Sequence, residues 1–266
     1  MALALADRAG SDPAEAAVRQ QPAGDRQRFE PFPPCPLDAG CPHCADRGEG
    51  GDDWSFVDAV YCISLADRGD RMAKAAAELH RVGLCRRVLF YRPQRHPTRV
   101  IEGIWESHRA VARHALARGA SAVLILEDDA VFGNRVKRGR LARVAATMRR
   151  LPPDWRLFFL GHWPLRARFL APHLLATASA CAHAYIISPR LMAWLAGLPS
   201  SRWTEPERRR AGGGIDAAYA ALDGSYAYFP MLAVQAVRGS DHMAYKKATR
   251  PIKKLRHLVT RTALGE

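Results

Sequence analysis

The sequence contains no long hydrophobic run, and no apolar stretch approaches the ~20 residues that a transmembrane helix needs. It also lacks the basic first segment and long apolar core of a secretory signal, because acids and polar residues interrupt residues 1–21. We see no internal repeat. These absences predict a cytoplasmic protein without a membrane span.

Acidic residues are scarce relative to basic ones, with 26 Asp and Glu against 40 Lys and Arg and a formal net charge of +14. This balance favours polyanionic partners, such as a nucleotide, a phosphorylated glycolipid, an anionic membrane face or a nucleic acid. The sequence lacks the aromatic and basic platform or recognition helix typical of nucleic-acid binding. Nucleic acid is therefore not expected as a partner. With 48% hydrophobic residues, the chain can bury a sizeable core.

The six cysteines do not form a complete zinc motif. Three lie in apolar surroundings and are predicted to be small core residues: Cys62, Cys85 and Cys181. The other three cluster in CPLDAGCPHC, as part of a zinc knuckle would: Cys35, Cys41 and Cys44. No second CxxC or HxxxH follows, so incidental thiols in a Pro-rich leader are the alternative.

Composition divides the chain into three parts. Residues 1–54 are rich in Pro, Gly, Asp, Arg and Ala, and predict a weakly structured extension. Residues 55–245 carry the periodic segments of one domain. Residues 246–266 form a basic tail with interspersed apolar residues, which could be a surface helix or lie on an anionic membrane.

Apolar strand-like runs and helix-like periodicity alternate through the domain. The strands are expected at residues 57–65, 88–91, 122–126, 157–160, 183–187 and 226–230. The helices are expected at residues 68–82, 103–118, 140–151, 189–196 and 215–222. This alternation predicts an α/β fold with a mostly parallel sheet flanked by helices.

Three carboxylates, Glu127, Asp128 and Asp129, directly follow the buried apolar run Val123–Leu126. Such a run predicts an inner strand, which delivers its last residues to the carboxyl edge where α/β sheets bind ligands. Adjacent acids repel one another and lose solvation when buried. Because residues 127 and 129 point to one side of a strand, they can share Mg²⁺ or Mn²⁺. A solvated acidic turn is the alternative.

The order of six short segments resembles glycosyltransferase family 25. The segments are ISLADRGDR, GIWESH, LILEDDAVF, FFLG, AHAYIISPR and GGID. The family includes bacterial lipopolysaccharide and lipooligosaccharide glycosyltransferases and is related to collagen galactosyltransferases. The resemblance covers roughly residues 57–240. It implies a GT-A-like (Rossmann-like) fold, a donor such as UDP-galactose or UDP-glucose, and divalent metal, Mn²⁺ or Mg²⁺.

The function that the resemblance implies is transfer of a hexose from a UDP-sugar to a glycan acceptor such as a lipopolysaccharide core. The acceptor would be an anionic glycan or glycolipid, and the enzyme would be cytoplasmic with peripheral contact at the inner membrane face. A non-catalytic nucleotide-sugar or glycan binding module of the same fold is the alternative.

The resemblance also assigns metal ligands. The last acid of such a motif is the firmest metal contact in GT-A enzymes, so Asp129 is the first candidate. Glu127 is the second, because strand alternation places it on the same side as Asp129. A third contact often comes from near the C-terminus, where His242 or Asp241 could serve. Asp128 would point elsewhere, to a ribose or to a neighbouring arginine.

The family's opening motif falls on residues 64–71, where donor contacts are expected. The residues implied are Ser64, Leu65, Arg68 and Arg71, although Ser64 stands where the family usually has Asn and Ala66 precedes Asp67. Arg68 and Arg71 would bind nucleotide or phosphate. A solvated first helical turn is the alternative for both arginines.

Two later motifs supply the remaining candidates. Ser107 and His108 match the family's Ser-His pair at the donor site, although periodicity also allows His108 to be an ordinary core histidine. Asp216 matches a late family Asp and could accept the proton of the acceptor hydroxyl. Its alternative role is the N-cap of the helix that follows.

Overall fold

The computed structural model describes residues 28–33, 54–85, 87–133, 136, 138–198 and 214–236. The predictions for the cysteine cluster, for Asp241 and His242, and for the basic tail lie outside these residues. None of the described helices is long and apolar enough to cross a bilayer.

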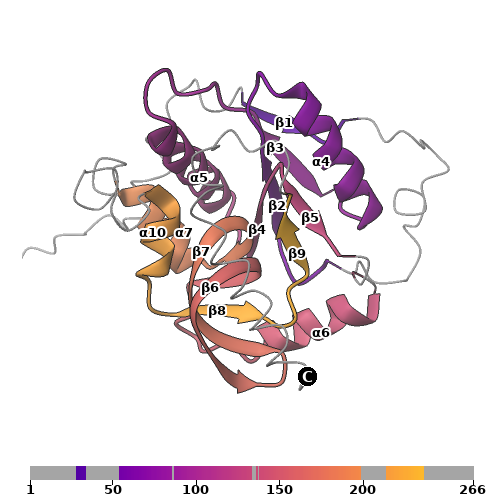
Figure 1. Cartoon of the computed structure of the whole chain (residues 1–266), viewed down its shortest axis with the longest axis vertical. Coiled ribbons are helices and arrows are strands. Elements are labelled where there is room, and N and C mark those ends of the chain that lie inside the picture. Colours follow the sequence, from indigo (N-terminus) through magenta and orange to yellow (C-terminus); the bar gives the residue numbers. More distant parts are fainter. Residues whose placement is uncertain are drawn as a thin grey trace, which may run out of the picture.

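The core of the fold is a seven-stranded sheet with the order β1-β3-β2-β4-β7-β6-β8 (Figure 1). Its parallel part consists of β2 (Ala59–Ile63), β3 (Val88–Tyr91) and β4 (Val123–Glu127). Two crossover helices connect these strands, α4 (Gly69–Arg81) and α5 (Val100–Ala117). All five elements are among those predicted from the hydrophobic pattern, and the α/β class is confirmed.

The remainder of the sheet is mixed, so the prediction of a mostly parallel sheet is wrong. β6 (Leu157–Ala171) and β7 (Leu174–Ile187) form a long hairpin, and β7 also pairs antiparallel with β4. β8 (Ser225–Tyr228) pairs parallel with β6 and antiparallel with β7. A two-residue turn joins β6 to β7, and so short a connection permits only antiparallel pairing.

Gly161, expected to end its strand, lies inside β6. A Cβ atom at this position would collide with the His183 side chain and with the backbone of Ala233. Glycine is needed here because neighbouring chain segments approach closely, which is its other common role in strands.

The N-terminal extension also contributes to the sheet, contrary to prediction. β1 (Phe29–Pro31) pairs antiparallel with β3, and the Phe29 ring stacks on His114 with centroids 3.9 Å apart. Three residues are too few to show a strand period, and Pro31 suits an edge strand because it has no N–H to donate.

Helices cover both faces of the sheet. α4 and α6 (Arg138–Met148) pack on one face; α5, α7 (Pro189–Gly197) and α10 (Gly214–Ala220) pack on the other. The side chains of β4 alternate accordingly, with Leu124 and Leu126 facing α4 and Val123 and Ile125 facing α5. The three cysteines predicted for the core are buried: Cys62, Cys85 and Cys181.

A second, two-stranded sheet lies beside the end of β4. It pairs β5 (Ala130–Phe132) antiparallel with β9 (Ala233–Gln235), and neither strand was predicted because each has only three residues. The backbone N–H of Ala236 donates to the Asp129 carbonyl at 2.8 Å. β9 thereby comes next to the acidic residues that follow β4.

Candidate binding site at the carboxyl ends of β2 and β4

The chain changes direction across the sheet between β2 and β4. α4 leads from β2 to β3 on one side, and α5 returns the chain to β4 on the other side of β2. Open α/β sheets bind ligands in the crevice outside the carboxyl ends at such a point. Here the Asp128 N–H donates to the Ile63 carbonyl at 3.1 Å and ties the two strand ends together.

A cavity opens at this crevice. The strand ends, the start of α4, the loop after β3, the first half of α5 and the end of β9 all contribute to its wall. The lining residues are Ile63, Leu65, Arg71, Gln94, Arg95, His96, Val100, Gly103, Ile104, Ser107, His108, Glu127, Asp128, Asp129 and Gln235.

Arg71 forms a buried ion-pair group with two of the acids. Its Nη2 atom lies 2.7 Å from Asp128 Oδ1 and 3.0 Å from Asp129 Oδ2. The three side chains are only 16%, 8% and 9% exposed. The alternative of a solvated helical turn is therefore excluded for Arg71.

The strand alternation assumed for the three acids does not continue past Glu127. β4 ends at Glu127, and the next two residues form a turn, so Asp128 and Asp129 both reach Arg71. Glu127 instead faces α5, where its Oε1 lies 3.4 Å from His108 Nε2. Asp128 contacts a neighbouring arginine, as expected. The expectation that Asp128 and Asp129 point to different sides is wrong, because both contact Arg71.

The two carboxylate oxygens of Asp129 differ in their hydrogen-bond partners among the described residues. Gln235 Nε2 donates to Oδ2 at 3.2 Å, a contact that spans 106 residues of sequence and had no sequence signal. Oδ1 is buried and has no hydrogen-bond partner among the described residues. A buried carboxylate oxygen without a partner is costly, and a bound cation would satisfy it.

Burial and mutual repulsion raise the pKa values of all three acids. Loss of solvent, followed by the charges of Asp216 and Asp128, raises the pKa of Glu127 to about 8. Loss of solvent also raises the pKa values of Asp128 and Asp129 to about 6, although Arg71 opposes both shifts. Arg71 does not balance three acids, so the site favours additional positive charge.

These residues fit a divalent cation that is shared with a ligand. Carboxylate oxygens suit Mg²⁺ and Mn²⁺, and Asp129 offers Oδ1. No group of three or more His, Cys, Asp or Glu side chains is arranged to hold a metal within the described ranges. Mg²⁺ is commonly held by one or two carboxylates, with phosphate and water completing its shell. His242, the third predicted ligand, is not among the described residues.

His108 is a buried core residue, as periodicity allowed, and it also lines the cavity. It is 1% exposed, and its Nδ1 lies 2.5 Å from the Tyr185 hydroxyl. Tyr219 in turn donates to the Tyr185 hydroxyl at 3.1 Å. Burial lowers the pKa of His108 to about 4, so the ring is neutral. If Tyr185 donates to Nδ1, then Nε2 carries the proton directed at Glu127.

Tyr185 and Tyr219 were missed because nothing in their local sequence separates them from apolar core residues. Both lie in buried segments, on β7 and α10, and only their hydroxyls reveal a polar role. A series of polar contacts therefore runs from the core to the cavity, from Tyr219 through Tyr185 and His108 to Glu127.

Some residues of the opening motif line the cavity, and others are buried behind its wall. Leu65 lines the cavity, whereas Ser64 is 1% exposed and its Oγ accepts a 2.9 Å hydrogen bond from Arg92. Ser64 also hydrogen-bonds Asp128, which opposes the rise in that carboxyl's pKa. Ser107 lines the cavity, and its hydroxyl donates to the Gly103 carbonyl at 2.7 Å.

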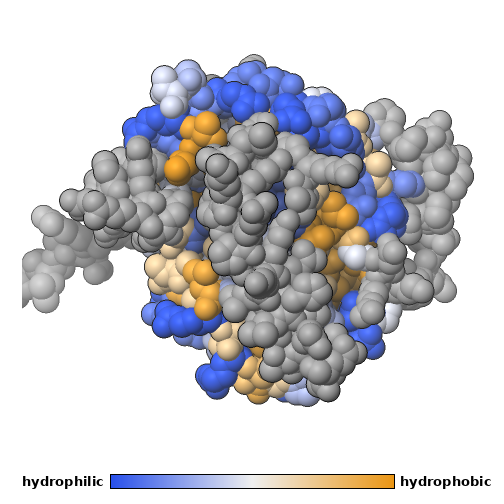
Figure 2. Space-filling view, in the orientation of Figure 1, coloured by the Kyte–Doolittle hydropathy of each residue, from blue (hydrophilic) through white to orange (hydrophobic). Residues whose placement is uncertain are grey.

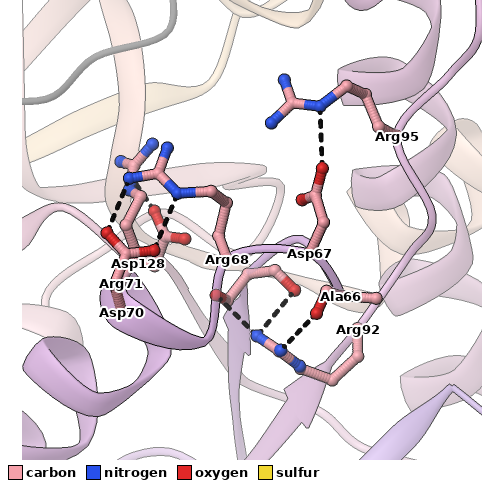
Figure 3. Close-up of polar contacts among 9 residues, drawn as sticks. Ala66, Asp67, Arg68, Asp70, Arg71, Arg92, Arg95 and Asp128 are labelled. Carbon is pink, nitrogen blue, oxygen red and sulfur yellow. Dashed lines mark hydrogen bonds and ion pairs between the residues drawn. The ribbon is translucent and has the colours of Figure 1, made fainter.

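The two other arginines at this edge differ from expectation. Arg68 pairs with Asp70 through Nε at 2.8 Å and Nη2 at 2.9 Å (Figure 3). It is not among the residues that line the cavity. Arg95, which was not predicted as a site residue, lines the cavity and pairs with Asp67 at 3.0 Å. The dense basic loop RPQRHPTR was its only sequence signal.

Asp216 is the third residue of α10 and therefore does not occupy the N-cap position. Its Oδ1 accepts a 3.0 Å hydrogen bond from the Ala182 N–H, which ties α10 to β7. It does not line the cavity, but its charge contributes to the raised pKa of Glu127.

The structure thus gathers most of the described candidates around one cavity. Those that line it are Leu65, Arg71, Ser107, His108, Glu127, Asp128 and Asp129. Ser64, Arg68 and Asp216 lie outside its wall. Comparison of the chain with protein-family models and with curated proteins finds no match in either set.

Proposed function

We propose that this chain is a GT-A-like hexosyltransferase that moves galactose or glucose from a UDP-sugar to a glycan acceptor such as a lipopolysaccharide core. The observation that carries the proposal is the group of Glu127, Asp128 and Asp129 beside Arg71, in a cavity at the crevice between β2 and β4. Nucleotides bind at this position in many α/β sheets. The motif order supplies the sugar-transfer part of the proposal.

In this proposal the basic side chains bind the donor diphosphate. Arg71 and Arg95 both line the cavity, and guanidinium groups can bind phosphate through two hydrogen bonds. Asp129, assisted by Glu127 or Asp128, would hold a divalent cation, which would neutralise charge on the departing diphosphate. Ile63, Leu65 and Ile104 provide apolar surface for the rest of the donor.

Asp216 is the proposed acceptor of the proton that leaves the acceptor hydroxyl, on the strength of the motif match. It lies outside the cavity wall; the hydrogen bond from Ala182 orients its carboxylate, and its charge contributes to the raised pKa of Glu127. A carboxylate in this role removes the proton as the hydroxyl attacks the sugar.

The first test measures donor use directly. The purified chain is incubated with UDP-galactose, UDP-glucose and other nucleotide sugars, with Mn²⁺, with Mg²⁺ or with a chelator. We expect release of UDP from one hexose donor, and we expect the chelator to reduce it. In parallel, calorimetry measures UDP binding with and without Mn²⁺.

The outcomes separate the competing functions. UDP binding without hydrolysis or transfer of any donor would support a non-catalytic binding module instead. If the chain binds random DNA more tightly than UDP and the binding weakens with salt, its positive charge functions in nucleic-acid binding. The proposal is then wrong.

Replacing Tyr185 with Phe tests the line of hydrogen bonds behind Glu127. Removal of the hydroxyl leaves His108 without its Nδ1 partner, so Glu127 loses an oriented neighbour. Partners that orient site residues from behind are commonly worth about 10- to 100-fold in activity. We expect kcat for donor hydrolysis to fall by about tenfold with little change in KM.

Tyr228→Phe is the matched control for this experiment. Tyr228 is also fully buried, but its hydroxyl has no hydrogen-bond partner among the described residues. Its replacement should leave kcat unchanged. If kcat falls equally in Y185F and Y228F, Tyr185 only supports the core. The same conclusion follows if the loss of kcat in Y185F is explained by a lower melting temperature.

A further inference from the structure

The outer half of the β6–β7 hairpin exposes apolar side chains. All residues from 165 to 170 are exposed, although they belong to a strand that pairs with β7. Five large hydrophobic side chains are exposed in the described parts of the chain, and three lie here: Leu165 at 56%, Phe169 at 52% and Leu170 at 41%. The other two, Val100 and Val131, lie on different elements, α5 and β5. Single exposed hydrophobics are ordinary, whereas a cluster indicates an interaction surface.

This part of β6 is also an edge strand. β7 pairs with β6 along the whole hairpin, but β8 pairs only with Leu157–Phe159. On the side of β6 away from β7, residues 165–170 pair with no other strand of the described chain. The ring of Phe169 is held edge-on against Phe229, with centroids 5.4 Å apart, which extends the apolar surface. The hairpin therefore presents apolar side chains together with a strand edge that no described strand covers.

Positive charge accompanies these apolar residues, and negative charge is absent. Arg166 and Arg168 lie between Leu165 and Phe169, and both are exposed. The sequence from residue 155 to residue 187 contains no Asp or Glu. Nothing in the hairpin itself therefore repels an anionic surface.

We propose that the hairpin patch, defined as Leu165, Arg166, Arg168, Phe169 and Leu170, docks on the anionic surface of a lipid bilayer. The apolar side chains would enter the interfacial layer, and the arginines would bind lipid phosphates. At the lower end of the molecule, where Figure 1 places this hairpin, Figure 2 shows hydrophobic and hydrophilic surface side by side. The proposal goes beyond the reaction proposed above and does not depend on it.

Charge favours a bilayer over a second copy of the chain. Two β6 edges that paired with each other would bring Arg166 and Arg168 of one copy close to the same arginines of the other. Like charges on facing strands are destabilising, and basic residues on edge strands discourage such pairing. Anionic lipid headgroups above an apolar layer complement both kinds of side chain in the patch.

The test uses the full chain and sedimentation with vesicles of phosphatidylcholine, with and without phosphatidylglycerol. We expect binding to the anionic vesicles. The R166S/R168S variant should weaken it by about fivefold for each arginine removed. The L165S/F169S/L170S variant should weaken it by about tenfold and remove the part of the binding that resists salt.

Two matched controls separate the patch from general charge and from exposed apolar surface elsewhere. R149S/R150S removes the same charge from exposed positions after α6, and Val131→Ser removes an exposed apolar side chain from β5. Both variants should bind vesicles as the unmodified chain does. Equal losses in R149S/R150S and R166S/R168S would overturn the proposal, because net charge alone would then explain binding.

Hydrogen exchange locates the contact without any substitution. Anionic vesicles should slow exchange of the amides of residues 165–170, whose outer edge pairs with no other strand in the described ranges. If the vesicles do not slow exchange at these amides, the proposal is wrong. It is also wrong if R166S/R168S changes self-association of the chain and leaves vesicle binding unchanged. Circular dichroism verifies that each variant folds, and the arginine variant, which changes only exposed positions, gives the deciding result if the apolar variant does not fold.

Discussion

Replacing Asp129 with Asn is expected to reduce donor hydrolysis and sugar transfer by about 10²- to 10³-fold, the usual cost of losing one group that stabilises developing charge. The substitution keeps the shape of the side chain but removes its negative charge. It also removes the buried Oδ1 carboxylate oxygen that has no partner among the described residues. A divalent cation would lose its best ligand, and Arg71 would keep only Asp128. Steady-state kinetics at varied Mn²⁺ should show a higher metal requirement as well as a lower kcat.

Asp70→Asn is the control for this effect. Asp70 immediately precedes Arg71, but it is 56% exposed and pairs with Arg68 outside the cavity wall. Its replacement changes the charge at the same edge of the sheet and should leave kcat within a factor of about two, as for most surface changes. Turnover by D129N equal to that of D70N would remove Asp129 from the proposed mechanism.

Replacing Glu127 with Gln is expected to stabilise the protein at alkaline pH while it lowers activity. Loss of solvent and the charges of Asp216 and Asp128 raise the pKa of Glu127 from 4.5 to about 8. The folded protein therefore holds this proton more tightly than the unfolded chain does. The free energy of unfolding is unaffected by Glu127 below about pH 4.5 and falls as the pH rises through about 8.

The glutamine side chain of E127Q does not ionise, so this fall should be absent from the variant. At about pH 9 the free energy of unfolding of E127Q should exceed that of the unmodified chain by about 2–4 kcal/mol, and the two should agree near pH 4. Urea unfolding across this pH range measures both values. A site that is less stable because of its function is common in enzymes.

Glu106→Gln provides the matched comparison on α5. Glu106 is 42% exposed and lies 3.3 Å from Arg109, so its removal should change stability by less than about 0.5 kcal/mol at any pH. Mn²⁺ with UDP should restore part of the lost stability of the unmodified chain at alkaline pH, because it supplies the missing positive charge. A difference between E127Q and the unmodified chain that does not vary with pH would contradict the proposed repulsion.

Local pattern predicted the elements that build the parallel half of the fold. β4 was recognisable because its apolar run is continuous, and α7 because Ser188, a common N-cap residue, directly precedes Pro189. The structure confirms this helix start, since the Ser188 hydroxyl accepts a hydrogen bond from the Leu191 N–H. These signals depend on neighbouring residues alone, and tertiary packing did not override them. The same reasoning placed the three acids at a strand end, where the structure also has them.

Local pattern could not reveal how the second half of the chain pairs. The hairpin of β6 and β7 passes through Gly161, and its outer residues 165–170 mix apolar and basic side chains that are all exposed. β5 and β9 have three residues each and are strands only because each pairs with the other. These features depend on contacts between residues distant in sequence, which leave no local periodicity.

The sequence by itself determined the α/β class, the acidic strand end and the residue types available to the site. Only the tertiary structure decided that Asp128 and Asp129 share Arg71, that Gln235 reaches Asp129, and that Glu127 faces His108. The reason is that strand alternation stops where β4 ends. Beyond that point the direction of a side chain is set by whichever buried charge or hydrogen-bond partner the rest of the fold brings near.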